Sequence, residues 1–232
     1  MHLLTQHNVT MTSISNTLIN MSYARNIFVS LLLTVTFFGH AYSMTFEVLI
    51  VGGEPAIIGV GPIVHGDADR LKALFIPKNK HSLGYYPLLL NSPGGNVGAA
   101  FAISKLMDEY TVYTYVLPGQ RCISACAAIV FIAGKEHLVV RDGLLGFHGC
   151  YNGQNKEINE MCNEIIAKHA LEHGTAYGSV MAFIATTPYD KVIWLSGEDA
   201  DCWAVNRYQI STKPENYEQC VFDSIRRTLR RQ

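Results

Sequence analysis

The pattern of apolar and polar positions predicts alternating strands and helices from residue 45 to about residue 205. Two β-rich runs at 45–51 and 56–60 are separated by Gly-Gly-Glu-Pro, which is typical of a β-hairpin. Beyond them, short apolar runs predict strands, and apolar residues spaced three and four apart predict helices. The predicted strands cover residues 86–90, 111–116, 138–140, 144–147 and 192–195, and the predicted helices start near 67 and 99 and cover 123–133, 156–173, 177–185 and 197–205.

The order of these elements predicts an α/β fold in which crossover helices connect parallel strands. Two segments rich in small and turn residues, 91–95 and 120–125, directly follow predicted strands. In parallel α/β sheets, ligands bind outside the carboxyl ends of the strands. We therefore expect these two segments to contribute to one site.

The first 43 residues have the layout of a secretory signal peptide. Arg25 precedes the apolar run 27–39, and Ala41-Tyr42-Ser43 places small residues before a cleavage point at Met44. The apolar run is shorter than the roughly 20 residues that cross a bilayer. The prediction is a signal peptide over 1–43 and one folded domain over 44–232, exported to the periplasm. An uncleaved signal anchor is the alternative, and only then would the protein contact a membrane.

The charge distribution gives no indication of a polyanionic partner. The chain holds 18 Lys and Arg residues against 19 Asp and Glu residues, with no basic stripe that could bind nucleic acid. A cluster of arginines near the C-terminus is explained by a solvated last helical turn, favoured by the helix dipole. Its members are Arg226, Arg227, Arg230 and Arg231.

All six cysteines follow the predicted cleavage point. An even number of cysteines in an exported chain indicates disulfide bonds, although the sequence leaves several pairings open. Cys126 also fits a buried free thiol in its apolar helical run, and Cys122 with Cys126 fits a redox pair. The cysteine spacing matches no zinc site. The preferred disulfides are Cys150 with Cys162 and Cys202 with Cys220.

Two short motifs carry the candidate chemistry. Residues 91–95 read Asn-Ser-Pro-Gly-Gly, and Ser124 lies in the run Gln-Arg-Cys-Ile-Ser-Ala-Cys. Glycines let a backbone approach a reacting carbonyl group and direct N–H groups toward it. A serine among small residues at the start of a helix could attack that carbonyl. The two motifs therefore favour acyl transfer, and a hydrolase above all.

Together with Gly146-Phe147-His148, these motifs resemble those of the proteolytic subunit of Clp protease, in the ClpP/crotonase superfamily. The chain is more closely similar to a set of exported bacterial ClpP-like proteins. The resemblance covers about residues 55–205 and implies a ClpP/crotonase-like fold with a serine peptidase site. The segments shared with that set are Gly61-Pro62-Ile63, Gly66-Asp67-Ala68, the Cys-x-Ser-Ala-Cys turn, Ala133-Gly134-Lys135 and Leu145-Gly146-Phe147-His148.

This resemblance implies roles for five residues. Ser124 would be the nucleophile and His148 the general base. A serine needs such a base within hydrogen-bond reach, and the substrate's carbonyl oxygen needs preorganised donors. The donors would be the loop of Gly94 and Gly95 together with the N–H group of Ala125.

The acid of the triad is where the sequence departs from the family pattern. In the family, the acid precedes a Leu-Ser/Thr-x-x-Glu-Ala segment, and Leu-Ser-Gly-Glu-Asp-Ala at 195–200 resembles that segment. The register upstream is shifted, with Pro188 near the expected position. Asp190 is the nearest carboxylate and is the predicted third member. A Ser–His dyad, oriented by a backbone carbonyl or water, is the alternative.

One rival motif points to metal chemistry. The run from His169 to His173 fits His-x-x-Glu-His, the inverted zinc-peptidase signature, and a helix would place both histidines on one face. So short a pattern is common by chance, and Lys168 beside it favours a solvated face. We therefore expect neither a metal nor a cofactor. A third zinc ligand would have to be Glu198, Glu215 or Glu218.

The sequence thus predicts an exported serine hydrolase, an ATP-independent peptidase acting on peptide or protein substrates. A non-catalytic ClpP-like protein that binds a peptide or acyl group is the alternative. Crotonase-type chemistry on acyl-CoA ranks below both, because CoA is intracellular and no basic phosphate-binding cluster is evident. Relatives of this fold assemble into rings or trimers, and 49% of the residues are hydrophobic while only 16% are charged. We therefore expect a homo-oligomer.

Overall fold

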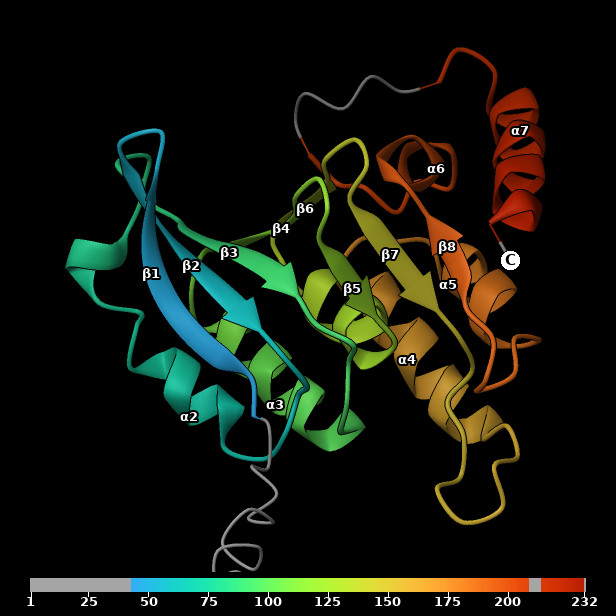
Figure 1. Cartoon of the computed structure of the whole chain (residues 1–232), viewed down its shortest axis with the longest axis horizontal. Coiled ribbons are helices and arrows are strands. Elements are labelled where there is room, and N and C mark those ends of the chain that lie inside the picture. Colours follow the sequence, from blue (N-terminus) through green and yellow to red (C-terminus); the bar gives the residue numbers. More distant parts are fainter. Residues whose placement is uncertain (1–42, 209–213, 232) are drawn as a thin grey trace, which may run out of the picture. The chain divides into compact units, whose positions relative to one another are not determined.

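The computed structural model describes residues 43–208 and 214–231. Within these residues, one sheet has the strand order β1-β2-β3-β4-β6 and a second has the order β5-β7-β8 (Figure 1). β1 and β2 form the predicted antiparallel hairpin, whereas β2, β3, β4 and β6 run parallel to one another. In the second sheet β5 and β7 are parallel, and β8 is antiparallel to β7. The strands are β1 (Thr45–Val51), β2 (Glu54–Val60), β3 (Tyr86–Asn91), β4 (Val112–Val116), β5 (Arg121–Ile123), β6 (Glu136–Val139), β7 (Leu144–Phe147) and β8 (Ile193–Leu195).

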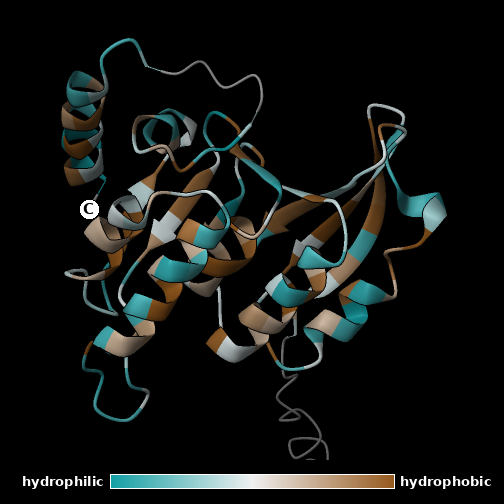
Figure 2. Ribbon diagram, turned by 180° about the vertical axis from the view of Figure 1, so that it is seen from behind, coloured by the Kyte–Doolittle hydropathy of each residue, from teal (hydrophilic) through white to brown (hydrophobic). Residues whose placement is uncertain are grey.

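The helices α3 and α4 lie behind the strands in Figure 1 and in front of them in the reverse view (Figure 2). In α3 the apolar residues recur at helical spacing and are buried, which is why this segment forms a helix against the sheet. No described helix is long and apolar enough to cross a membrane. The helices are α2 (Asp67–Lys72), η2 (Pro77–Asn79), α3 (Val97–Asp108), η3 (Cys126–Phe131), α4 (Glu160–Glu172), α5 (Tyr177–Ile184), α6 (Gly197–Cys202) and α7 (Tyr217–Arg230). The mixed α/β class with mostly parallel strands is confirmed.

The helix η3 forms the centre of the core. It is of the π type, and every one of its residues is buried. It contacts α3, α4, β5 and β7, so the helix is held from several sides. The buried His169 places Nε2 3.1 Å from the carbonyl oxygen of Ile129 and satisfies a backbone group of this helix. Burial lowers the pKa of His169, so the imidazole is neutral in this contact.

Two predicted helices begin later than expected. Residues 121–123 pair with β7 as strand β5, so the helix predicted from residue 123 starts only at Cys126. The helix predicted from residue 156 starts at Glu160, where the Asn159 side chain accepts a hydrogen bond from the N–H of Cys162. The strand β5 was not predicted, because three residues are too few to show an alternating pattern.

Three disulfide bonds join the six cysteines. Both preferred pairs, Cys150–Cys162 and Cys202–Cys220, are confirmed. The alternative of a free thiol at Cys126 is wrong, because Cys126 is bonded to Cys122. Three intramolecular disulfides fit an oxidising, extracellular-type environment.

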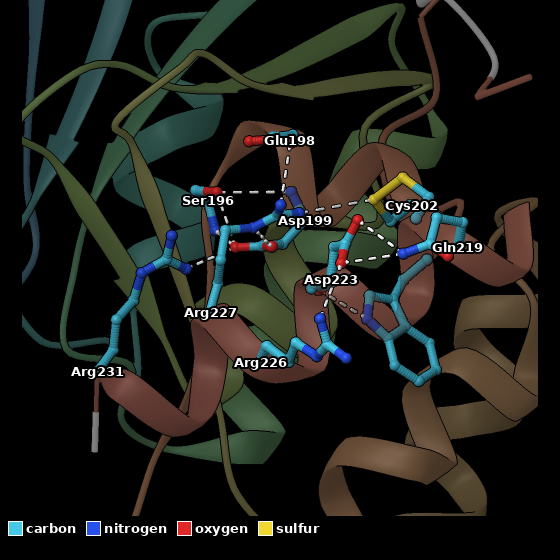
Figure 3. A network of polar contacts seen from close by, with 12 residues as sticks. Ser196, Glu198, Asp199, Cys202, Gln219, Asp223, Arg226, Arg227 and Arg231 are labelled. Carbon is cyan, nitrogen blue, oxygen red and sulfur yellow. Dashed lines mark hydrogen bonds and ion pairs between the residues drawn. A yellow bond between two sulfur atoms is a disulfide. The ribbon is translucent and has the colours of Figure 1, made fainter. Parts of the chain in front are cut away.

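The sequence suggested that the four C-terminal arginines are merely solvated, but two of them bind a buried carboxylate. Arg227 Nε and Arg231 Nη1 lie 2.8 and 2.5 Å from the two carboxylate oxygens of Asp199, whose side chain is fully buried (Figure 3). Burial alone would raise the pKa of the Asp199 carboxyl group. Hydrogen bonds from Arg231, Ser196 and Arg227 outweigh burial and hold that pKa below its usual value. The pairs fasten α7 to the start of α6.

Candidate active site

A groove of about 580 Å³ opens where the chain leaves three parallel strands, β3, β5 and β7. This is the edge at which parallel sheets bind ligands. No Asp, Glu, Lys or Arg side chain lines it among the described residues. All the predicted site residues except Asp190 line this groove. They are Ser124, His148, Gly94, Gly95 and Ala125.

Ser124 lies in the turn between β5 and η3. Its φ angle of 57° is in the left-handed region, which is uncommon for a residue other than glycine. Its N–H group donates to the carbonyl oxygen of Gly146 at 2.8 Å, and its own carbonyl accepts from Ala128 N–H at 2.9 Å. A strained serine between a strand and a helix exposes its hydroxyl group, and such strain gathers at functional sites.

The turn can approach β7 closely because position 146 is a glycine. A Cβ atom at Gly146 would lie 2.8 Å from Val192 Cγ1 and 2.9 Å from Ile123 Cγ2. Any larger residue would have to displace the side chains of Val192 and Ile123. Glycine at this position therefore keeps the Ser124 turn in register with the strand that leads to His148.

The Gly-Gly loop packs directly against the serine turn. A Cβ atom at Gly94 (φ 85°) would lie 2.4 Å from the Ile123 carbonyl oxygen and 2.8 Å from Ser124 Cβ. A Cβ atom at Gly95 (φ 150°) would lie 2.2 Å from the Ile63 carbonyl oxygen. Only glycine fits at either position. The contact also explains how two motifs about thirty residues apart form one site.

The N–H groups of these loops differ in their partners. The Gly94 N–H donates to Ser92 Oγ at 3.1 Å inside the loop. Those of Gly95 and Ala125 have no hydrogen-bond acceptor among the residues that the structure describes. Both residues line the groove, so their N–H groups can serve an incoming carbonyl oxygen. Of the predicted oxyanion donors, Gly95 and Ala125 are thus the available pair.

The geometry of His148 fixes its tautomer. Its Nδ1 lies 2.9 Å from the carbonyl oxygen of Gly149, and a carbonyl oxygen can only accept a hydrogen bond. Nδ1 must therefore carry the proton, which leaves Nε2 of the neutral ring as the free base. Gly149 is held in place, since a Cβ there would lie 2.7 Å from the carbonyl oxygen of Ile184. The ring centroid of Tyr151 lies 6.0 Å from that of His148 and borders the groove.

The structure does not bring Asp190 into the groove. Asp190 is exposed and lines a different pocket, with Trp194 and Arg231 among its neighbours. Within the described part of the chain, no hydrogen bond or ion pair joins Asp190 to His148, and the orienting acceptor is the Gly149 carbonyl. Nor do Ser124 Oγ and His148 Nε2 form a hydrogen bond with each other there. In free enzymes such bonds are often long and tighten only with substrate.

Sequence reasoning missed several residues of the groove. Tyr151 and the Cys150–Cys162 disulfide follow His148 closely, and that proximity was the available signal. The apolar lining comes from three helices, and no local pattern indicates that these residues share a site. They are Val97 of α3, Ala128 of η3 and Ile166 of α4.

The two histidines of the rival zinc motif have protein partners. His169 contacts the Ile129 carbonyl as described, whereas His173 Nε2 lies 3.0 Å from Asp108 Oδ1 and its Nδ1 lies 2.8 Å from the carbonyl oxygen of His169. No group of three or more His, Cys, Asp or Glu side chains that could hold a metal ion occurs in the described residues. These contacts assign both histidines to packing between α3, η3 and α4.

No protein-family model matches the chain. No curated protein matches its sequence. The function must therefore be argued from the groove itself.

Proposed function

We propose that this chain is an exported serine hydrolase of the ClpP/crotonase superfamily, a peptidase that acts without an ATPase. One observation carries the proposal. Ser124, a histidine whose Nε2 is the free base, and two N–H groups that have no acceptor among the described residues line the same groove. These are the parts that acyl transfer through a serine requires.

Each part has a defined step. Ser124 Oγ attacks the substrate carbonyl while His148 Nε2 takes the hydroxyl proton. The oxyanion accepts hydrogen bonds from Gly95 and Ala125, and the loss of one such donor costs about 3 kcal/mol in known hydrolases. The imidazolium then gives its proton to the leaving amine, and water hydrolyses the acyl-enzyme with His148 again as base. Throughout, the Gly149 carbonyl orients the ring through Nδ1.

The lining of the groove supports a neutral peptide as substrate. Val97, Ala128 and Ile166 offer an apolar surface to a substrate side chain. No lysine or arginine lines the groove among the described residues, so nothing there would bind the phosphates of CoA. This observation supports a peptidase over crotonase-type chemistry.

The alternative is a non-catalytic protein that keeps the groove and binds a peptide. It is favoured by one observation, the lack of a carboxylate partner for His148 in the described structure. Incubation of the mature protein with an unfolded protein such as casein separates the two proposals. We expect slow cleavage that is lost in Ser124→Ala and His148→Ala but retained in the surface controls Ser82→Ala and His65→Ala. If the wild type binds casein but does not cleave it, the result would favour the alternative.

Export to the periplasm is part of the proposal. It is supported by the three disulfides and by the signal-like pattern, whose residues 1–42 lie outside the described residues. Mass spectrometry of the exported protein should find Met44 at its N-terminus. An intact N-terminus on membrane-bound protein would favour the anchor instead.

Assembly into a homo-oligomer also remains a proposal. Apolar side chains on the edge strand β1 and on α7 are exposed in the single chain, and surfaces of this kind mark interfaces. They include Leu49, Ile50, Val51, Phe222 and Leu229. Light scattering at micromolar concentration should report more than one chain per particle, and a monomer would rule the proposal out.

A further inference from the structure

We propose that the Cys122–Cys126 disulfide is the positioning element of the nucleophile, holding Ser124 in the left-handed turn from which it attacks. The inference rests on the proposed hydrolase function and adds a condition to it. The nucleophile would reach its full rate only in the oxidised protein, so the enzyme would be much slower until it reaches an oxidising compartment.

The disulfide spans the serine symmetrically. Cys122 is in β5, Ser124 is the first residue after the strand, and Cys126 is the first residue of η3. The Cα atoms of the two cysteines are 5.3 Å apart, whereas four residues of extended chain would cover roughly 13 Å. The bond therefore closes a small ring of backbone whose central residue is the proposed nucleophile.

The conformation at the centre of this ring is one that serine does not favour. A φ angle of 57° is unfavourable for a residue with a Cβ atom and persists only where the surroundings enforce it. Two hydrogen bonds fix the turn from outside: Ile123 N–H to the Ser92 carbonyl (2.9 Å) and Ser124 N–H to the Gly146 carbonyl (2.8 Å). The disulfide is the one covalent restraint on the turn in the described structure, and it acts on both ends.

Neither of the other two disulfides spans Ser124. Cys150–Cys162 ties the segment after His148 to the first turn of α4, and Cys150 borders the groove. Cys202–Cys220 joins α6 to α7, and neither of its cysteines lines the groove. The chain thus contains its own control, since Cys202–Cys220 stabilises the fold without touching the proposed site.

Formation of the bond needs an oxidant, and the class of oxidant is a protein or small-molecule disulfide. The thiols of Cys122 and Cys126 lose two protons and two electrons, and the oxidant's disulfide is reduced to two thiols. Both cysteines are fully buried in the folded protein. The exchange must therefore occur before the core closes, or during local opening.

The test measures the rate at which a fluorophosphonate probe modifies Ser124 in the mature protein. We expect Cys122→Ala/Cys126→Ala to lower the maximal inactivation rate by about 10- to 100-fold, the scale reported for misplacement of a reacting group by about 1 Å. The probe's half-saturation concentration should change little, because the groove remains. Cys202→Ala/Cys220→Ala should lower the melting temperature but leave the labelling rate within about twofold of wild type.

Circular dichroism shows whether each variant is folded, so a slow reaction can be distinguished from a failure to fold. If the Cys122→Ala/Cys126→Ala variant does not fold, the test uses Cys122→Val/Cys126→Ala instead. Valine restores side-chain volume at the buried position in β5. A folded variant labelled as fast as wild type overturns the positioning role and leaves the hydrolase proposal intact. Wild-type protein that is never labelled overturns the proposed function itself, whatever the disulfide does. A loss of rate in both cysteine pairs alike, matched by equal loss of melting temperature, shows a role in stability only and overturns the inference.

Discussion

His148 donates a hydrogen bond from Nδ1 to the carbonyl oxygen of Gly149, 2.9 Å away, within its own loop. In a Ser-His-Asp triad a carboxylate takes this position, where it fixes the tautomer and stabilises the imidazolium. A neutral carbonyl fixes the tautomer but adds less stabilisation of the positive charge. The proposed hydrolase would therefore work through a Ser–His dyad, and we expect it to turn over slowly.

The first prediction concerns Asp190. Because Asp190 is exposed and lines another pocket, Asp190→Asn should change turnover by less than about twofold, whereas His148→Ala should abolish it. Steady-state cleavage of a fluorogenic peptide measures both. A fall of about 10⁴-fold in Asp190→Asn, as follows when a triad loses its carboxylate, would show that Asp190 reaches His148 in the working enzyme.

A second prediction concerns the glycine loop. Gly94→Ala would place a Cβ 2.8 Å from Ser124 Cβ at a positive φ, so it should reduce probe labelling about 100-fold. Its free energy of unfolding should fall by about 1–3 kcal/mol. Gly153 also lines the groove, but a Cβ there meets no atom within 4 Å. Gly153→Ala should behave like wild type in both measurements, and equal losses in the two variants would contradict the packing described for Gly94.

The sequence indicated which loops and residues form this site, but not which groups form hydrogen bonds or ion pairs with them. Hydrophobic periodicity predicted the β1–β2 hairpin and the parallel strands, so it also predicted that the loops after them would meet. Glycines at 94 and 95 and a serine flanked by small residues were recognisable because close backbone approach requires those residue types. The even number of cysteines indicated disulfides, and the preferred pairs Cys150–Cys162 and Cys202–Cys220 are the ones that form.

The orienting group of His148 could not be predicted in the same way. Every residue carries a carbonyl oxygen, so a backbone acceptor such as that of Gly149 leaves no signal in the sequence. A carboxylate does leave one, which drew attention to Asp190. Asp199 was missed for a related reason: its arginine partners lie about thirty residues away on α7, and only the folded chain joins them.

The pH dependence of stability provides a third prediction, through His137. Burial lowers the pKa of His137 to about 4, against a smaller opposing effect of its hydrogen bond to the Gly134 carbonyl. In the unfolded chain this histidine has its ordinary pKa of 6.5, so unfolding takes up a proton between about pH 4 and 6.5. Stability is thus fully present above pH 6.5 and falls as pH decreases through that window, by about 3 kcal/mol for this group.

Urea unfolding of wild type and His137→Gln at several pH values tests this expectation. The variant is expected to be less stable at pH 7, but its stability should fall less steeply between pH 6.5 and 4. Some slope should remain, because burial also lowers the pKa of His169. His65→Gln, at an exposed position, should keep the wild-type slope. If the free energy of unfolding changes equally with pH in wild type and His137→Gln, His137 does not contribute to the pH dependence.

The fourth prediction concerns the attachment of α7. Asp199→Asn leaves Arg227 and Arg231 without their buried carboxylate and should lower the free energy of unfolding by about 2–4 kcal/mol, allowing for the partial exposure of both arginines. Since the folded pKa of Asp199 is lowered, this contribution is present above its unfolded pKa and is lost as pH falls through the folded value. Asp223→Asn, whose ion pair with Arg226 is long and exposed, should cost less than about 0.5 kcal/mol. Equal melting temperatures for the two variants would contradict the anchoring role.

The central claim, that Ser124 is a nucleophile activated by His148, is tested most directly by locating a covalent adduct. The mature, oxidised protein is incubated with a fluorophosphonate, digested and analysed by mass spectrometry. We predict one phosphonylated residue, Ser124, in the wild type, no adduct in Ser124→Ala, and labelling slowed by at least about 100-fold in His148→Ala. Absence of an adduct on folded wild type, or labelling of Ser124 that is as fast in His148→Ala as in wild type, would contradict the account.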